Sequence, residues 1–122
     1  MISVSSALED YLEAIYEISR LKSNVRITDI ALRLGISKPS VNRAVNTLKQ
    51  HGLVTHEPYG EIVLTEHGRE IGESVNRRHR MIKKFLVNVL HLSEADAEKE
   101  ACCIEHNISQ NTVDRMRSYM EG

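Results

Sequence analysis

Three residues near the end of the chain combine the side chains that bind transition metals. Cys102, Glu105 and His106 are separated by steps of three and four residues, so on a helix all three would project from the same face. A thiolate, a carboxylate and an imidazole favour a transition metal over calcium or magnesium, which prefer oxygen ligands. A structural role is also compatible with these residues, because a cysteine can act as a small buried hydrophobic group.

Further candidate ligands lie on two other predicted helices. His79 falls on the apolar stripe of a helix predicted at residues 66–90, and Asp10 and Glu13 share a face of a helix predicted at residues 6–21. A lone histidine on an apolar face is usually structural, and acidic side chains on a helix are usually solvated. Position alone therefore does not make these three residues ligands.

A second group of polar residues suits DNA recognition. Asn42, Arg43 and Asn46 lie on the polar face of a helix predicted at residues 37–50. An arginine can donate to the acceptor edge of guanine, and an asparagine can pair with adenine or contact a phosphate. Basic and small polar residues nearby suit the phosphate backbone, which positions a protein without specifying sequence. The residues predicted to contact DNA are Arg26, Thr28, Ser37, Lys38, Pro39, Ser40, Asn42, Arg43, Asn46, Lys49 and Tyr59.

Charge is segregated along the chain, although the formal net charge is only −1. Basic side chains prevail between residues 20 and 49, where Asp29 is the single acid, while acidic side chains gather near the start and again late in the chain. A basic face and a separate acidic cluster suggest two partners of opposite charge. An ordinary solvated surface would give the same pattern, so segregation by itself decides nothing.

Two short helices separated by a tight turn predict a helix-turn-helix. The first is expected at residues 29–34, with Thr28 as its N-cap and Gly35 ending it. Ser37 is expected to cap the helix at residues 37–50, which has a proline in its first turn, where a missing amide donor matters little. Such a pair of helices is typical of DNA-binding domains.

A hairpin follows the second of these helices. Residues 53–57 and 61–65 are predicted to form two short strands around the turn Pro58-Tyr59-Gly60. A hairpin placed directly after a recognition helix is a wing. The first part of the chain is therefore predicted to be a winged helix-turn-helix.

Three helices are predicted after the wing, at residues 66–90, 94–107 and 110–120, with Ser93 and Ser109 as N-caps of the last two. They are short and apolar on one side, so we expect that side to be buried against a second copy of the chain. The side chains that need such cover are Phe85, Leu86, Val89, Val113 and Met116.

The composition argues against several other classes of protein. No apolar run is long enough to cross a membrane and no signal peptide is recognised, so a cytoplasmic protein without membrane contact is expected. Two adjacent cysteines do not make a disulfide framework. No nucleophile–base pair and no glycine-rich phosphate loop is recognised, so an enzyme is not expected.

The chain resembles the diphtheria toxin repressor and manganese transport regulator family of metal-dependent transcriptional repressors along nearly its whole length. The motifs that carry the resemblance are EDYLEAIY at 9–16, ISKPSV at 36–41, VLT at 63–65 with Gly68, RHR at 78–80 and EACCIEH at 100–106. The resemblance implies a winged-helix domain, a helical dimerisation domain and a metal centre. The ligand positions that it implies are Asp10, Glu13, His79, Cys102, Glu105 and His106.

Three residues depart from the patterns within that family. Iron-type members carry Met where this chain has Asp10, and manganese-type members carry Glu where it has Cys102. Lys83 stands where iron-type members have an acidic residue of an ancillary site, which argues against that site here. Asp10, Glu13 and His79 match the manganese-type arrangement of two neighbouring ions. The soft thiolate of Cys102 favours Fe²⁺, Co²⁺ or Zn²⁺, whereas the carboxylates favour harder ions, so the metal stays open.

We therefore expect a mainly α protein with a winged helix-turn-helix DNA-binding domain at 1–74 and a helical metal-binding and dimerisation domain at 75–122. Its expected function is repression of metal-homeostasis genes, with Mn²⁺ or Fe²⁺ as corepressor and Co²⁺, Ni²⁺ or Zn²⁺ as substitutes in vitro. The expected partners are palindromic double-stranded operator DNA and a second copy of the chain. The alternatives are a metal-independent winged-helix regulator gated by another ligand, and a metalloenzyme with an open coordination position.

Overall fold

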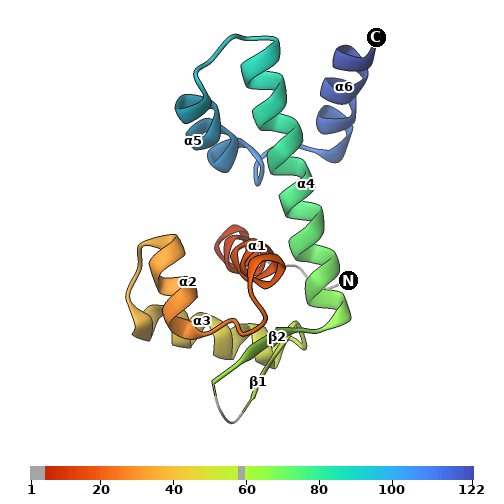
Figure 1. The fold of residues 1–122 in the computed structure, drawn as a ribbon. Helices are drawn as coiled ribbons and strands as arrows, with labels where there is room; N and C mark the ends of the chain where they lie inside the picture. Colours follow the sequence, from red (N-terminus) through yellow and green to blue (C-terminus); the bar gives the residue numbers. More distant parts are fainter. Residues whose placement is uncertain (1–4, 58–59) are drawn as a thin grey trace. The chain divides into compact units, whose positions relative to one another are not determined.

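The structure is a computed structural model that describes residues 5–57 and 60–122. Helices dominate these residues, which confirms the predicted mainly α fold class (Figure 1). Backbone contacts divide the chain into two compact units, an N-terminal unit Met1–Ser74 and a C-terminal unit Val75–Gly122. The elements are α1 (Ser6–Leu21), α2 (Ile27–Leu34), α3 (Lys38–Gln50), β1 (Val54–His56), β2 (Ile62–Leu64), α4 (Glu66–Asn88), α5 (Glu94–Ile104) and α6 (Gln110–Glu121).

Helix α2 begins earlier than its sequence predicts. The expected cap, Thr28, lies inside the helix, and the N-cap is Arg26. The reason is the carboxylate of Asp29, which accepts a hydrogen bond of 2.9 Å from the backbone N–H of Arg26 and so satisfies the helix start from its third position. The predicted end is confirmed, because Gly35 adopts the left-handed conformation with φ of 67° that favours glycine.

Helix α3 follows the predicted pattern. The hydroxyl of Ser37 accepts from the backbone N–H of Ser40 at 3.3 Å, which confirms Ser37 as the N-cap. Val41, Val45 and Leu48 are fully buried. These apolar residues fix one face of α3 against the core, and the opposite, polar face is left to solvent.

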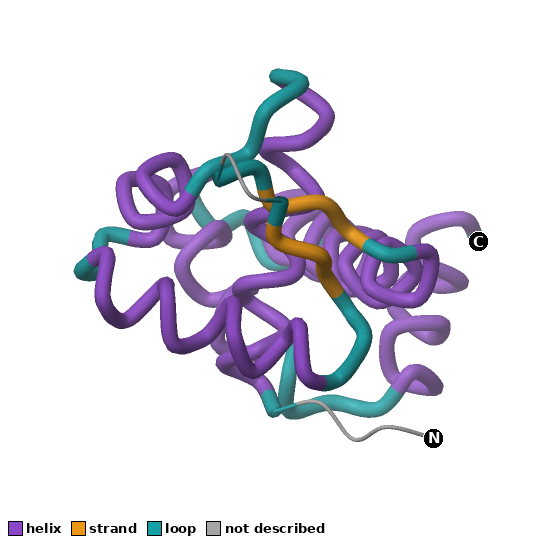
Figure 2. Tube along the Cα trace, turned by 90° about the horizontal axis from the view of Figure 1, so that it is seen from below, coloured by secondary structure: helices purple, strands orange, loops and turns teal. Residues whose placement is uncertain are grey.

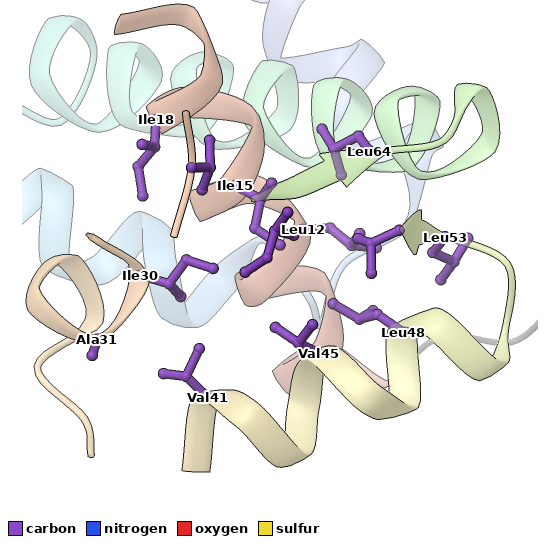
Figure 3. Close-up of a cluster of buried hydrophobic side chains, with 13 residues drawn as sticks. Leu12, Ile15, Ile18, Ile30, Ala31, Val41, Val45, Leu48, Leu53 and Leu64 are labelled. Atoms are coloured by element: carbon purple, nitrogen blue, oxygen red, sulfur yellow. The ribbon is translucent and has the colours of Figure 1, made fainter. Parts of the chain in front are cut away.

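The core of the N-terminal unit joins all of its elements. Figure 3 shows buried side chains from α1, α2, α3 and the hairpin pointing toward one another. Leu12 and Ile15 of α1 and Ile30 of α2 meet the apolar face of α3, and Leu53 and Leu64 close the cluster from the hairpin. Because the recognition helix and the hairpin share this core, their relative placement is fixed by packing.

The hairpin forms where it is predicted, but its strands are shorter than predicted. β1 and β2 pair antiparallel, with Thr55 opposite Val63 (Figure 2). Ile62 and Leu64 are buried while Val63 is 39% exposed, so the side chains alternate between core and solvent. The backbone N–H of Ile62 also donates to the carbonyl of Val25 at 2.8 Å, which ties the wing to the segment before α2.

Two glycines allow the first turns of α4 to approach neighbouring backbone closely. A Cβ atom on Gly68 would lie 1.9 Å from the carbonyl oxygen of Leu53. A Cβ atom on Gly72, four residues later, would lie 2.8 Å from the carbonyl oxygen of Leu12. Both distances are too short for any side chain, so only glycine fits at these two positions.

The C-terminal unit packs α5 and α6 against the second part of α4. Ser93 and Ser109 accept from the backbone N–H groups three residues later, which confirms both predicted caps. The core consists of Ile82, Leu86, Ala97, Ala101 and Val113. Leu86 and Val113 were predicted to need a second copy for cover, and this prediction is wrong for both, because they are buried in the unit's own core.

Among the described residues, the structure shows no helix that is long and apolar enough to span a membrane.

Candidate metal centre and DNA-binding face

The predicted ligands of the C-terminal unit do not all project from one helix. α5 ends at Ile104, and Glu105 is its C-cap, still in the helical region with φ of −57°. His106 lies in the turn that follows, where the backbone N–H of Asn107 donates to the carbonyl of Ile104 at 2.9 Å. The tighter turn ends α5 three residues before its predicted end.

Glu105 lies at the centre of the candidate site. It is 2% exposed, and its Oε2 lies 3.0 Å from Nδ1 of His79, in hydrogen-bond geometry. Its Oε1 lies 3.4 Å from Nε2 of His106, without the geometry of a hydrogen bond. Within the described part of the chain this buried oxygen has no hydrogen-bond partner. A buried acceptor without a donor is destabilising by about 1–3 kcal/mol, so Oε1 suits a cation.

Cys102 and Glu98 also lie beside His79. The sulfur of Cys102 is 3.9 Å from Nδ1 of His79 and 3.9 Å from a carboxylate oxygen of Glu98. Glu98 pairs with the second ring nitrogen of His79, Nε2. Candidate ligand atoms of His79, Glu98 and Cys102 all lie within 4.8 Å of one another. Sequence reasoning missed Glu98, and the available signal was its position one helical turn before Cys102.

Lys83 supplies a positive charge beside this cluster. Its Nζ lies 3.2 Å from Oε1 of Glu98 and 3.3 Å from Oε2 of Glu94. The hydrogen bond to Glu98 raises the pKa of Lys83 above its usual range. Burial raises the pKa of Glu98, but the charges of His79 and Lys83 outweigh it and leave this pKa below its usual range. Glu98 is therefore held as an anion between Lys83 and the ring of His79.

The other two predicted ligands belong to the N-terminal unit. Asp10 and Glu13 lie three residues apart on α1, so they share a face of that helix. The structure thus brings His79, Cys102, Glu105 and His106 together in the C-terminal unit and places Asp10 and Glu13 on α1 of the other unit.

The donor set fits a divalent transition metal. Nitrogen, sulfur and carboxylate oxygen together match ions of intermediate softness, and His79 and Glu105 orient each other as ligands commonly do. A carboxylate buried beside two imidazoles is difficult to explain as packing alone, because desolvation penalises its charge.

The polar face of α3 carries the predicted base-reading residues. Asn42, Arg43, Asn46 and Lys49 are all exposed. The guanidinium of Arg43 donates to the hydroxyl of Ser40 at 3.3 Å, so its head lies toward the start of α3. A recognition helix commonly contacts bases with its N-terminal residues.

The remaining predicted DNA contacts surround α3. Ser37, Lys38 and Pro39 are exposed at its start, and Thr28 is exposed on α2. Arg26 lies beside the wing, since a Cβ atom on Gly60 would be 2.8 Å from Nη1 of Arg26. Tyr59 lies outside the described residues.

Comparison with known proteins identifies both parts of the chain. Residues 3–62 match the model described as "Iron dependent repressor, N-terminal DNA binding domain", and residues 65–122 match "Iron dependent repressor, metal binding and dimerisation domain". An uncharacterized HTH-type transcriptional regulator of Methanocaldococcus jannaschii is 37% identical over 119 residues, which cover 97% of this chain and 95% of that one. The HTH-type transcriptional regulator MntR of Bacillus subtilis is 33% identical and is covered to 77%, with 90% of this chain aligned.

Solved structures show the same relationship. A structure of a manganese-dependent transcriptional repressor in complex with manganese has a TM-score of 0.86 at 30% identity, and the manganese regulator SloR has a TM-score of 0.84 at 32% identity. Both cover 93% of this chain, which spans only about half the length of each (52% and 53%). Members of this family are transcriptional regulators and not enzymes. The chain belongs to the iron-dependent repressor family, the metal-dependent DNA-binding repressors that include the diphtheria toxin repressor and the manganese regulators.

Proposed function

We propose that this chain represses metal-homeostasis genes when Mn²⁺ or Fe²⁺ occupies a centre formed by His79, Cys102, Glu105 and His106, completed by Asp10 and Glu13. The observation that carries the proposal is the buried carboxylate of Glu105, with one oxygen on His79 and the other lacking a hydrogen-bond partner among the described residues. Asp10 and Glu13 rest on the family resemblance. Both metals are named because the donor set mixes carboxylates, which favour Mn²⁺, with a thiolate, which favours Fe²⁺.

Repulsion among the anionic side chains is the basis of the proposed switch. Asp10, Glu13 and Glu105 carry carboxylates. Repulsion between like charges opposes assembly of the proposed centre unless a cation compensates it. A bound divalent ion supplies that positive charge. Because Asp10 and Glu13 lie on α1, which shares a core with α3, their engagement would bias the placement of the recognition helix.

The proposed DNA target is a palindromic operator bound by a homodimer. Two copies of α3 related by a two-fold axis would enter successive major grooves, about one helical turn or a multiple apart. Arg43, Asn42 and Asn46 are proposed to contact base edges, while Arg26, Lys38 and Lys49 contact phosphates. A regulator that works on chromosomal DNA is proposed to be cytoplasmic.

The test begins with selection of DNA. Purified metal-free protein is incubated with a random duplex library, with and without Mn²⁺ or Fe²⁺, and the enriched duplex is used to measure affinity by fluorescence anisotropy. We expect enrichment only with metal, an inverted-repeat sequence, and at least a tenfold gain in affinity on metal addition. Full affinity for DNA without metal would contradict the proposal and favour a regulator gated by another ligand.

A matched pair of variants locates the centre. Glu105→Gln keeps the size of the side chain and removes its charge, so it should abolish metal activation of DNA binding. Glu100→Gln makes the same change at an exposed position of α5 and should leave activation unchanged. Equal activation in both variants would show that the buried carboxylate is not a ligand.

A further inference from the structure

Arg78, the residue before His79 on α4, holds the turn that carries two of the proposed ligands. Its Nη2 donates to the carbonyl oxygen of Glu105 at 2.7 Å and to that of Ile108 at 2.6 Å. Its Nη1 donates to the side-chain oxygen of Gln110 at 3.4 Å. One guanidinium thus spans the whole connection between α5 and α6.

The bond to Glu105, the C-cap of α5, satisfies a backbone group that a helix end leaves open. The last carbonyls of a helix have no partner within the helix and carry partial negative charge. A guanidinium is suited to this position because its planar fork can reach two oxygens and its charge strengthens each bond. The turn after α5 is therefore held by a side chain from α4 and not by its own backbone alone.

Glu105 is held at both of its ends by consecutive residues of α4. Arg78 binds its backbone carbonyl, and His79 binds its carboxylate at 3.0 Å. His106 follows directly, so the direction of its ring depends on the same backbone. A small displacement of this turn would move two proposed ligands together relative to His79.

We propose that Arg78 is a positioning residue of the metal centre, which orders the backbone of Glu105 and the turn after it before an ion binds. The inference rests on the proposed metal centre, since it concerns the residues that hold its ligands. Groups that orient metal ligands typically contribute 10- to 100-fold in metal affinity. Arg78 differs from such groups in acting on the backbone of a ligand and not on its side chain.

The variant Arg78→Lys tests the positioning role of Arg78, because it keeps the positive charge and removes the planar guanidinium that donates to several oxygens. We expect Co²⁺ affinity, measured by competition with a chelator, to fall at least tenfold, and the visible absorption of the Co²⁺ form to change shape. Backbone amides between residues 104 and 110 should also exchange hydrogen faster in the metal-free variant. Arg80→Lys is the control, since Arg80 is exposed on the same helix.

The outcomes separate the two proposals. Wild-type protein that binds neither Co²⁺ nor Mn²⁺ would overturn the metal centre and this inference together. Wild-type binding with an unchanged affinity and spectrum in Arg78→Lys would overturn only the role of Arg78. A purely structural role would lower the melting temperature but leave the Co²⁺ spectrum of the folded protein unchanged.

A milder variant serves if Arg78→Lys does not fold. Gln110→Ala removes one of the three acceptors and leaves the guanidinium in place. A two- to fivefold weaker Co²⁺ affinity with faster exchange in the same turn would support the inference, whereas wild-type values for both would overturn it.

Discussion

At the scale of single residues, Cys102 separates this chain from the manganese-type members that it resembles, which carry Glu at this position. Its sulfur lies beside His79 and Glu98, at 3.9 Å from each, so it faces the candidate centre although the residue is exposed. A soft, polarisable thiolate prefers Fe²⁺, Co²⁺ or Zn²⁺ to Mn²⁺. The neighbouring Cys103 is exposed as well, but side chains one position apart on a helix diverge by about 100°.

This geometry predicts a change of metal preference in Cys102→Glu. A carboxylate in place of the thiolate should shift activation of DNA binding toward Mn²⁺ and away from Fe²⁺ and Co²⁺. Each tenfold change corresponds to about 1.4 kcal/mol, so even a modest preference is measurable. Wild-type protein with Co²⁺ should show sulfur-to-metal charge-transfer absorption, which the variant should lack.

Cys103→Glu is the matched control, because it adds the same carboxylate one position away. It should retain both the charge-transfer band and the wild-type ranking of metals. If wild-type protein shows no such band and Cys102→Glu keeps the wild-type ranking, Cys102 is not a ligand.

The recognition helix gives a second prediction at this scale. Arg43→Ala should weaken specific binding by about 1–3 kcal/mol and relax discrimination at one base pair of each half-site. Lys49→Ala should weaken binding to all sequences alike and reduce the salt dependence, because a lost phosphate contact releases fewer counterions. Affinities for selected and scrambled duplexes at several salt concentrations separate the two effects, and equal losses in both variants would contradict this placement of the reading face.

Sequence reasoning indicated candidate ligands but not the residues that contact them. The motif at 100–106 and the position of His79 on an apolar helix face can be recognised from the amino-acid sequence alone. Glu98 has a sequence signal in its position one helical turn before Cys102. Arg78 becomes visible only through its partners, the carbonyl oxygens of Glu105 and Ile108. A backbone acceptor carries no sequence signal, so the role of Arg78 could not be read from its neighbours.

At the scale of elements, helix starts were more predictable than helix ends. Serine caps at positions 5, 37, 93 and 109 accept from N–H groups three residues later, a pattern that is local in sequence. The start of α2 departed from its prediction because the cap is supplied by Asp29 from inside the helix. The end of α5 departed because the stop comes from a turn, and no glycine or proline marks it.

The cap on α2 predicts a pH-dependent effect of Asp29→Ala. The hydrogen bond from the backbone N–H of Arg26, with Lys22 in support, holds the pKa of Asp29 below its usual value. Removing the carboxylate should lower the free energy of unfolding by about 1 kcal/mol at neutral pH. Because the folded pKa is lowered, this difference is fully present above the ordinary pKa and disappears as pH falls through the lowered one.

Urea unfolding of both proteins between pH 7 and pH 2.5 measures this effect. Glu57→Ala, which removes a carboxylate from the wing, provides a comparison at a position that caps no helix. A difference between wild type and Asp29→Ala that persisted unchanged at the lowest pH would contradict the electrostatic explanation.

At the scale of the whole molecule, the family match assigns dimerisation to residues 65–122. In the C-terminal unit, the end of α4 and the end of α6 form an open groove of about 560 Å³. Of its lining residues, Tyr119 is a large apolar side chain that is 69% exposed. The groove is lined by Met81, Lys84, Asn88, Val89, Arg117, Tyr119, Met120 and Glu121.

We expect this face to meet a second copy of the chain even without metal. Sedimentation of metal-free protein at micromolar concentration should show a dimer, and Tyr119→Glu should shift it toward monomer because a charge would be buried. Ser118→Glu places the same charge at the adjacent exposed position and should have a smaller effect. A stable metal-free monomer of the wild-type protein would contradict the expectation.

Gly68 and Gly72 make a mutational screen for lost repression difficult to interpret. Neither position offers a side chain to metal or DNA, yet every substitution would press a Cβ atom against the carbonyl oxygen of Leu53 or Leu12. Such a screen would identify these two positions together with the proposed ligands, because both groups of variants would lose repression. Measuring the cellular abundance of folded protein for each variant separates the two groups. Glycine variants should be less abundant, whereas ligand variants should keep their abundance and lose only their response to metal.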